Sequence, residues 1–211
     1  MKLLERTALF SVALLALAAC ASTTTFTSTW KAPDAQPLDP RGHKVAAVFI
    51  STDESSRRVA EDVLVRKLDE RGAQGIASYT LIPTAAVSDF DSVKKQLADA
   101  GVDGVVVMRV IDQRQKITVR NDAPFFGYPP YYWRFSGYWG YGWGAPYAPT
   151  EVSSTTVLSI ESLVYSLTRD TLIWAGTSRT TDPGNVEKLV NEVADAAAKQ
   201  MTKQGLLPKQ A

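Results

Sequence analysis

The apolar positions of the chain first form a pattern near residue 43. The run HKVAAVFIS, residues 43–51, is apolar and contains Val and Ile, which is typical of a buried strand. After it, apolar residues recur at helical spacing until Gly72, a residue type that commonly follows helix ends. This stripe consists of Val59, Ala60, Val63, Leu64 and Leu68. Ser51 and Glu54 stand at capping-box spacing before it, so the pattern predicts a strand followed by a helix.

The same order is repeated once. The segment GIASYTLIP, residues 75–83, predicts a second strand that is closed by Pro83. In SDFDSVKKQLADAG, residues 88–101, apolar residues recur at helical spacing before Gly101. They are Phe90, Val93, Leu97 and Ala100. These two segments therefore predict another strand and another helix.

Three strands follow in the pattern. Residues 102–119, VDGVVVMRVIDQRQKITV, are apolar on both faces in their first half, which indicates a central strand. Residues 151–167 and 171–180 predict two further strands joined by a short turn. In the first of these two, the apolar face changes at Glu161 and Ser162, which predicts a β-bulge there.

The last stretch, residues 185–204, predicts a long helix. Its inward residues are Val186, Leu189, Val190, Val193, Ala197 and Met201. The predicted order is β-α-β-α-β-β-β-α, in which two crossover helices and a terminal helix cover a mixed sheet. We therefore expect a single α/β (α+β mixed-sheet) domain over residues 43–207, with an insert at residues 121–150.

The N-terminus has the features of a secretory signal peptide over residues 1–19: a basic start, an apolar run and small residues before a cysteine. The four residues Leu17, Ala18, Ala19 and Cys20 resemble the lipobox of bacterial lipoproteins, whose cysteine is acylated, with palmitate among the usual chains. This resemblance implies a lipid anchor at Cys20. In Gram-negative lipoproteins an Asp at the next position favours the inner membrane, and here Ala21 implies the outer membrane, with the domain in the periplasm. Residues 20–42, rich in Thr, Ser and Pro, predict a flexible tether.

Charge and composition exclude several classes of function. The chain has 23 Lys and Arg against 22 Asp and Glu, without a basic run, which argues against nucleic acid as a partner. Cys20 is the only cysteine and His43 the only histidine. The usual zinc sites and the Cys-His and Ser-His-Asp nucleophile systems are therefore unavailable, and we expect no catalytic residue, metal or cofactor.

The lipobox, the segment after it and the order of elements together resemble the periplasmic lipoproteins that share the fold of the TolB amino-terminal domain. This group includes the curli secretion lipoprotein CsgG and the penicillin-binding-protein activator LpoB. The resemblance is carried by KVAAVFIS, the helix at residues 55–71, VDGVVVMRV and the terminal helix. It implies a noncatalytic envelope domain that works by contacting other proteins, and it assigns no site residue.

One stretch is unlike the rest of the chain: FFGYPPYYWRFSGYWGYGWGAPY, residues 125–147. Twelve of its 23 residues are aromatic, and Arg134 is its only charged residue. Large rings recur at every second position, as on one side of an extended strand. Alternatively, Ser136 and Gly137 form a hairpin turn, which would place Arg134 opposite Trp139 as a cation–π pair. The candidate interaction residues are Tyr131, Trp133, Arg134, Phe135, Tyr138, Trp139, Tyr141 and Trp143.

Three interpretations of this tract remain open. It could be a loop that folds over its own sheet. It could be a contact surface for a protein or a glycan, because Tyr and Trp dominate binding hot spots and stack on sugars. It could also lie in the headgroup region of a membrane, which Trp and Tyr prefer. Pro129, Pro130 and Pro146 interrupt it, which disfavours a membrane-spanning strand.

Other candidate chemistry is better explained structurally. Ser92 and Lys95 have the S-x-x-K spacing of penicillin-recognising enzymes, but the companion motifs are missing. Asp89 and Asp91 suggest a helix start more than a calcium site. Gly140, Gly142 and Gly144 precede no helix and make no phosphate loop. Asp53, Glu54, Asp112 and Glu161 could provide a carboxylate pair for a hydrolase, but the sequence gives no means of bringing two of them to glycosidase separation.

We therefore expect a noncatalytic outer-membrane lipoprotein that acts as an interaction module in envelope assembly or maintenance. The alternative is a lipoprotein that binds peptidoglycan or another polysaccharide through the aromatic insert. The expected partners are the membrane, through the lipid, and an envelope protein or glycan, and the domain could also form oligomers.

Overall fold

The computed structural model describes residues 23–83, 90–120 and 151–209. Contacts divide the chain into two units, residues 1–114 with 156–211, and residues 115–155. In the second unit, the described residues are the adjoining ends of strands β4 and β5. The first unit contains the sheet core and the helices, and the following description concerns it.

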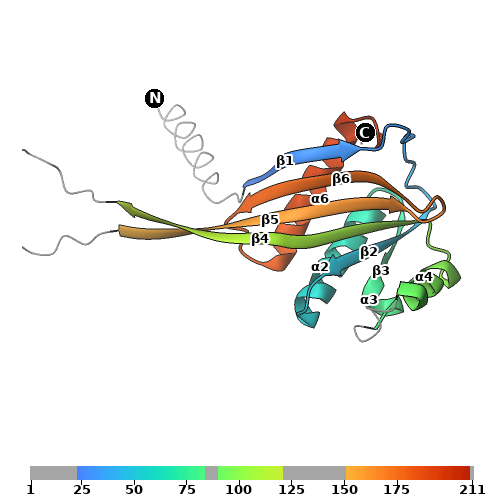
Figure 1. The fold of residues 1–211 in the computed structure, drawn as a ribbon, viewed down its shortest axis with the longest axis horizontal. Helices are drawn as coiled ribbons and strands as arrows, with labels where there is room; N and C mark the ends of the chain where they lie inside the picture. Colours follow the sequence, from blue (N-terminus) through green and yellow to red (C-terminus); the bar gives the residue numbers. More distant parts are fainter. Residues whose placement is uncertain (1–22, 84–89, 121–150, 210–211) are drawn as a thin grey trace, which may run out of the picture. The chain divides into compact units, whose positions relative to one another are not determined.

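The fold is a six-stranded mixed sheet in the order β1-β6-β5-β4-β2-β3 (Figure 1). The strands are β1 (Thr23–Lys31), β2 (Lys44–Ile50), β3 (Gln74–Ala77), β4 (Gly104–Arg120), β5 (Glu151–Ser166) and β6 (Thr171–Thr181). Strand β2 is parallel to β3 and β4, whereas β6 is antiparallel to β1 and β5. The described helices are α2 (Glu54–Asp69), α3 (Ser78–Leu81), α4 (Phe90–Asp99) and α6 (Val186–Lys203). The predicted α/β class with a mixed sheet is confirmed.

The sheet is covered on both faces, because alternate residues of its central strands are apolar in both directions. Ala47 and Phe49 of β2 pack in a cluster with α2 and α6. Ala46, which precedes them on the strand, packs on the other face with Leu97 of α4 and Val105 of β4. A third cluster joins β6 to the end of α6 and the segment after it, through Ile173, Trp174, Ala197, Met201 and Leu206.

The helix boundaries follow local capping. Asp53, and not Ser51, caps α2, because its carboxylate accepts the N–H of Ser56 at 2.8 Å. The Ser51 hydroxyl accepts the N–H of Asp53 instead, so the predicted capping box is wrong. Asn185 caps α6 in the same way through the N–H of Lys188 at 2.8 Å, at the predicted start of that helix.

The buried face of α2 is rotated slightly from the predicted apolar stripe. Val59 is exposed, whereas the helix buries an ion pair beside its apolar residues. The buried residues are Arg57, Ala60, Glu61, Val63 and Leu64. Helix α6 follows its prediction closely, with Leu189, Val190, Val193, Ala197 and Met201 all buried.

The predicted flexible tether, residues 20–42, is wrong over most of its length. Residues Thr23–Lys31 form β1, which pairs with β6 along the edge of the sheet, with a bulge at Thr27. Threonine favours strands, but the segment has only Phe26 and Trp30 as large apolar residues, and Trp30 is exposed, so no alternating apolar face marks it as a strand. The rest, residues 32–43, is fixed by backbone hydrogen bonds: Ala32 N–H to Ile173 O at 3.0 Å and Leu38 N–H to Leu206 O at 2.7 Å.

Two further predictions need correction. The segment predicted as one strand, residues 75–83, leaves the sheet after Ala77 and forms the short helix α3. The bulge predicted at Glu161 and Ser162 is absent from the pairing of β5 with β6, where the register breaks between Val164 and Tyr165.

The apolar face of β5 changes for another reason. Leu158 and Ile160 pack with α2 and α6, whereas Tyr165 and Leu167 pack in the cluster of α4. On the face that α4 covers, β5 is thus packed only near its end. The bulge itself makes Ile173 an extra residue of β6, so Ile173 and Trp174 are buried in the same cluster.

Candidate functional site

The site residues predicted from the sequence lie outside the described residues. These are Cys20 and the aromatic set Tyr131, Trp133, Arg134, Phe135, Tyr138, Trp139, Tyr141 and Trp143. Their roles stay predictions. The structure does, however, place the segments of chain that follow Cys20 and that flank the insert.

The catalytic candidates that the structure describes are engaged in ordinary structural contacts. Lys95 pairs with Asp99 one turn along α4, and Ser92 accepts a hydrogen bond from Gln96 at 2.9 Å. His43 lies at the start of β2, more than half exposed, with its Nδ1 3.1 Å from Asp103 Oδ2.

The four carboxylates that could have formed a hydrolytic pair each have a different partner. Glu54 pairs with Arg58 at 2.7 Å, and Asp112 pairs with Arg114 at 2.7 Å. Glu161 pairs with Arg109 at 2.7 Å, and Asp53 caps α2. In the part of the chain that the structure describes, no three His, Cys, Asp or Glu side chains are grouped as a metal would require. Across the same residues, no helix has the length and apolar character needed to cross a membrane.

A buried polar network lies under the first half of α2. Glu61 is fully buried, and its Oε1 accepts hydrogen bonds from Arg57 Nε at 3.1 Å, Ser78 Oγ at 2.7 Å and Phe49 N at 3.1 Å. Its Oε2 accepts the N–H of Tyr79 at 2.8 Å. The network joins α2 to β2 and α3, and it explains why the chain bends into a helix at Ser78. Because both carboxylate oxygens are used, this buried acid has a structural role.

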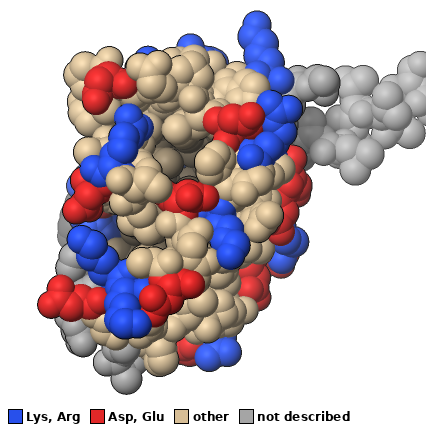
Figure 2. Space-filling model, turned by 90° about the vertical axis from the view of Figure 1, so that its right-hand side faces the viewer, with Lys and Arg blue, Asp and Glu red and all other residues tan. Residues whose placement is uncertain are grey.

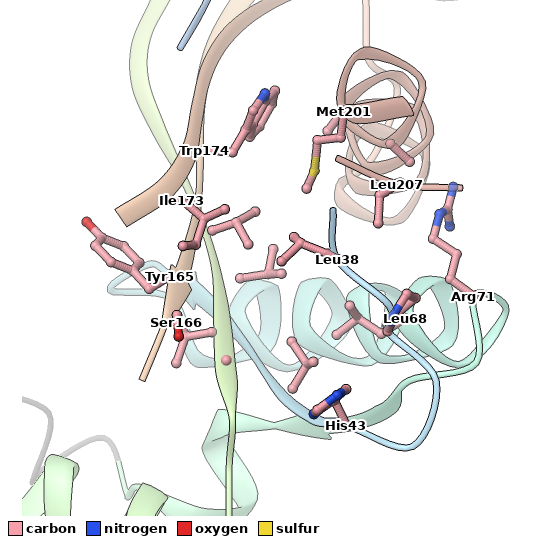
Figure 3. Close-up of a pocket in the computed structure, with 18 of the residues that line it drawn as sticks. Leu38, His43, Leu68, Arg71, Tyr165, Ser166, Ile173, Trp174, Met201 and Leu207 are labelled. Carbon is pink, nitrogen blue, oxygen red and sulfur yellow. The ribbon is translucent and has the colours of Figure 1, made fainter. Parts of the chain in front are cut away.

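A cavity of about 380 Å³ lies under the second half of α2, between the sheet, α2 and α6 (Figure 3). Its walls are mostly apolar. Side chains from both helices and from β4, β5 and β6 line it, among them Leu64, Leu68, Met108, Val164, Ala197 and Met201. A volume of about 300–1,000 Å³ with such walls is typical of a small-molecule site.

The segment between β1 and β2 closes one side of this cavity. We call residues 32–43 the strap. Leu38 of the strap points into the cavity between Leu68 and Met201 (Figure 3). The strap is fixed at Ile173, at Leu206 and, through the Gly42 N–H to Gly72 O bond of 3.1 Å, at the end of α2. Within the strap, hydrogen bonds from Arg41 hold the pKa of Asp39 below its ordinary value.

Polar groups gather where the cavity opens. His43, Asp103, Ser166, Thr168 and Arg169 line this end of the cavity, at the start of β4 and the end of β5. Figure 2 shows the molecule from this side, with basic and acidic side chains interspersed around a recessed surface. Deeper inside, Ser162 of β5 is almost fully buried, and its hydroxyl has no hydrogen-bond partner among the described residues.

The sequence did not reveal this cavity. Its walls come from residues that were correctly predicted to face inward, such as Leu64, Leu68, Ala197 and Met201. Whether inward residues meet or leave a space depends on their distances in three dimensions. The one signal available was Ser162, a polar residue on the side of β5 that also carries Leu158, Ile160 and Val164.

No protein-family model matches the chain, and no curated protein matches it in sequence. Among solved structures, it is similar to a dodecamer of a methionine-substituted PelC from Paraburkholderia phytofirmans, with a TM-score of 0.46 and 12% identity over 90% of this chain and 100% of that chain. A second PelC dodecamer from that organism has a TM-score of 0.44 and 12% identity, over 83% of this chain and 94% of that chain. Lipoprotein GNA1162 from Neisseria meningitidis has a TM-score of 0.42 and 14% identity, over 76% of this chain and 99% of that chain. The resemblance to the TolB amino-terminal-domain group stays a prediction.

Proposed function

We propose that this protein is an outer-membrane lipoprotein whose periplasmic domain acts by binding other envelope components, without catalysis, in envelope assembly or maintenance. The anchor is the lipid at Cys20, and the aromatic insert at residues 121–150 is the contact surface. The observation that carries the proposal is the position of two strand ends in the first unit.

The first of these ends is the start of β1. Thr23 pairs with Thr181 at the end of β6, and it follows Cys20 by three residues. Three residues span at most about 11 Å. A lipid at Cys20 therefore supports a domain that lies directly against the headgroups, without the long tether that the sequence suggested.

The second is the point at which β5 enters the first unit. Thr156 and Asp182 exchange two hydrogen bonds of 2.8 Å, from Thr156 N–H to Asp182 Oδ1 and from Asp182 N–H to Thr156 O. Asp182 directly follows Thr181, the partner of Thr23. The proposed anchor and the insert are therefore both joined to the first unit at the same end of β6.

The contacts of the candidate carboxylates with other protein groups support a binding role over a catalytic one. Each candidate carboxylate is occupied by a cap or an ion pair, and the buried acid Glu61 has four donors around it. A general acid or base needs access to a substrate, which the fully buried Glu61 lacks.

The anchor is tested by growing cells with radioactive palmitate. We expect the intact protein to be labelled and Cys20→Ala to be unlabelled, with the wild-type protein in the outer-membrane fraction. An unlabelled wild-type protein would contradict the anchor.

The contact surface is tested by deleting residues 121–150 and joining the strands with an Asn-Gly turn. We expect this variant to remain lipidated and folded, as judged by circular dichroism, and to lose at least one protein that copurifies with the wild type from cross-linked envelopes. An unchanged set of partners would exclude the insert as the contact. Pelleting of the purified protein with protein-free sacculi, abolished by the same deletion, would instead support the glycan-binding alternative. Oligomer formation stays a prediction, which sedimentation of the extracted protein would test.

A further inference from the structure

We propose that the cavity beside the strap binds one long-chain fatty acid, with the hydrocarbon chain inside and the carboxylate at the opening near Arg169. This inference goes beyond the proposed function, because it concerns the opposite end of the sheet. The cavity opens where β6 begins, and β1 starts where β6 ends. These ends are about 30 Å apart along β6, at about 3.3 Å per residue, so the lipid on Cys20 is not the expected occupant.

The size of the cavity fits one acyl chain. An engineered apolar cavity of about 150 Å³ holds one benzene molecule, which has six carbon atoms. By that proportion, the 380 Å³ found here accommodates at most about 15 carbon atoms, because a methylene group is larger than an aromatic C–H. This is the range of a single fatty-acid chain, whereas the two chains of a phospholipid would need about twice the space.

The lining of the cavity favours a flexible apolar ligand. Aliphatic and methionine side chains form most of its surface, and Met201 adapts its shape easily to a contact. An unfilled apolar cavity of this size leaves its wall atoms without van der Waals partners. Ser162 adds a buried hydroxyl that lines the cavity and has no partner in the described part of the chain, which is unusual for a buried polar group.

The opening offers a basic group for the carboxylate. Lys67 and Arg71 also line the cavity, but both pair with Asp195 of α6, at 3.2 and 3.5 Å. His43 faces Asp103. Arg169, in the turn between β5 and β6, makes no ion pair with any of the residues described, and the hydroxyls of Ser166 and Thr168 lie in the same turn. Charge complementarity therefore favours an anionic head at Arg169.

The strap gives the chain a way in. Leu38 occupies the space between the two helices, and the strap that carries it is held by only a few hydrogen bonds to other elements. The bonds to Leu206 and Gly72 end outside α6 and α2, so displacing the strap breaks no hydrogen bond within either helix.

The test uses the intact lipidated protein in vesicles of dimyristoylphosphatidylcholine, a neutral lipid. A palmitate that carries a photoreactive diazirine near its methyl end is added, and the cross-linked peptides are mapped by mass spectrometry after irradiation. We expect cross-links on cavity residues of β5 and α6, such as Val164 and Met201. An excess of palmitate should remove them, and hexadecanol, which lacks the carboxylate, should compete roughly threefold less well or worse, as expected from the loss of a partly exposed ion pair.

Two variants locate the two ends of the ligand. Ala197→Phe takes up part of the cavity and should reduce cavity cross-links by about tenfold or more, because the added ring occupies the space of several methylene groups. Arg169→Ala should weaken binding by roughly two- to fivefold, as expected for a partly exposed ion pair. Lys95→Ala, on α4, is the matched charge control and should change nothing.

The map of cross-links in the wild-type protein tests the proposal even if a variant misfolds. Cross-links confined to peptides outside the cavity, or unchanged by excess palmitate, would overturn the proposal. Equal competition by hexadecanol or by lysophosphatidylcholine would overturn the choice of a fatty acid.

Discussion

The two halves of helix α2 cover the same face of the same sheet, yet they do so in different ways. The first half carries Arg57 and Glu61, whose polar atoms are bonded to β2 and α3 in a filled core. The second half carries Leu64 and Leu68, which border a cavity.

This difference separates the part of α2 that supports the fold from the part that borders space for a ligand. A buried carboxylate often indicates a reactive site, but both oxygens of Glu61 are bonded and its side chain is shielded from solvent. The apolar half, which contains no conspicuous residue, has the space that a ligand requires. In this domain the charged half of the helix is structural, and the plain half is the candidate for binding.

The largest expected effect comes from breaking the polar half. Glu61→Ala would leave the Arg57 guanidinium buried without its carboxylate, along with three other donors. Removing one partner of a buried ion pair costs about 3–5 kcal/mol of unfolding free energy. Urea denaturation measures this loss. Glu70→Ala, just after the exposed end of α2, is the control and should change stability by less than about 1 kcal/mol. Similar losses for the two variants would show that the network contributes little.

A larger side chain in each half compares the packing directly. Ala60 is fully buried in the filled core, so Ala60→Phe should cost about 1–3 kcal/mol or more through overpacking. Ala197 lines the cavity, so Ala197→Phe should leave the free energy of unfolding unchanged or raise it. Both are measured by urea denaturation of the ligand-free protein. Equal destabilisation by the two would mean that the cavity is not available space.

The smallest expected effect concerns the cap of α2. Hydrogen bonds from the side chain and the backbone N–H of Ser56 hold the pKa of Asp53 below its ordinary value. A carboxyl whose pKa is lower in the folded protein stabilises the fold above the unfolded pKa, about 3.9, and this contribution is lost as the pH falls through the folded pKa. Thermal melts between about pH 6 and about pH 2, chosen to bracket these values, should show a smaller acid-induced loss for Asp53→Asn than for the wild type. The neutral amide still caps the helix. Parallel curves would contradict this role of Asp53.

Most of the fold follows from local patterns. Helix α6 was predicted from its stripe and its cap, and the central strands were predicted from their apolar runs. The edge strand β1 was missed because its residues, TTTFTSTWK, have the composition of a linker, and only pairing with β6 makes them a strand. Helix α3 was missed because the contacts of Ser78 with Arg57 and Glu61 outweigh the strand preference of Ile, Tyr and Thr.

The buried pair and the cavity could not be predicted for a related reason. Arg57 and Glu61 have the i, i+4 spacing of a common surface pair, and the partners that bury them come from β2 and α3. The cavity exists because the side chains of five elements together do not fill the space between them, and the sequence of one segment cannot show this. The described residues thus provide a candidate site that the sequence did not suggest, and the sequence candidates at residues 131–143 remain to be tested.

The edge position of β1 has a consequence for how the protein matures. Thr24 lies beside Thr180, 156 residues further along the chain, and β6, the strand with which β1 pairs, follows all the other described strands in the sequence. Among the described strands β1 pairs only with β6, so it stays unpaired until β6 has been made, and a contact between residues so far apart forms late. For the lipoprotein proposed above, that interval is when an enzyme could acylate Cys20, before closure of the sheet edge shortens the link between domain and bilayer.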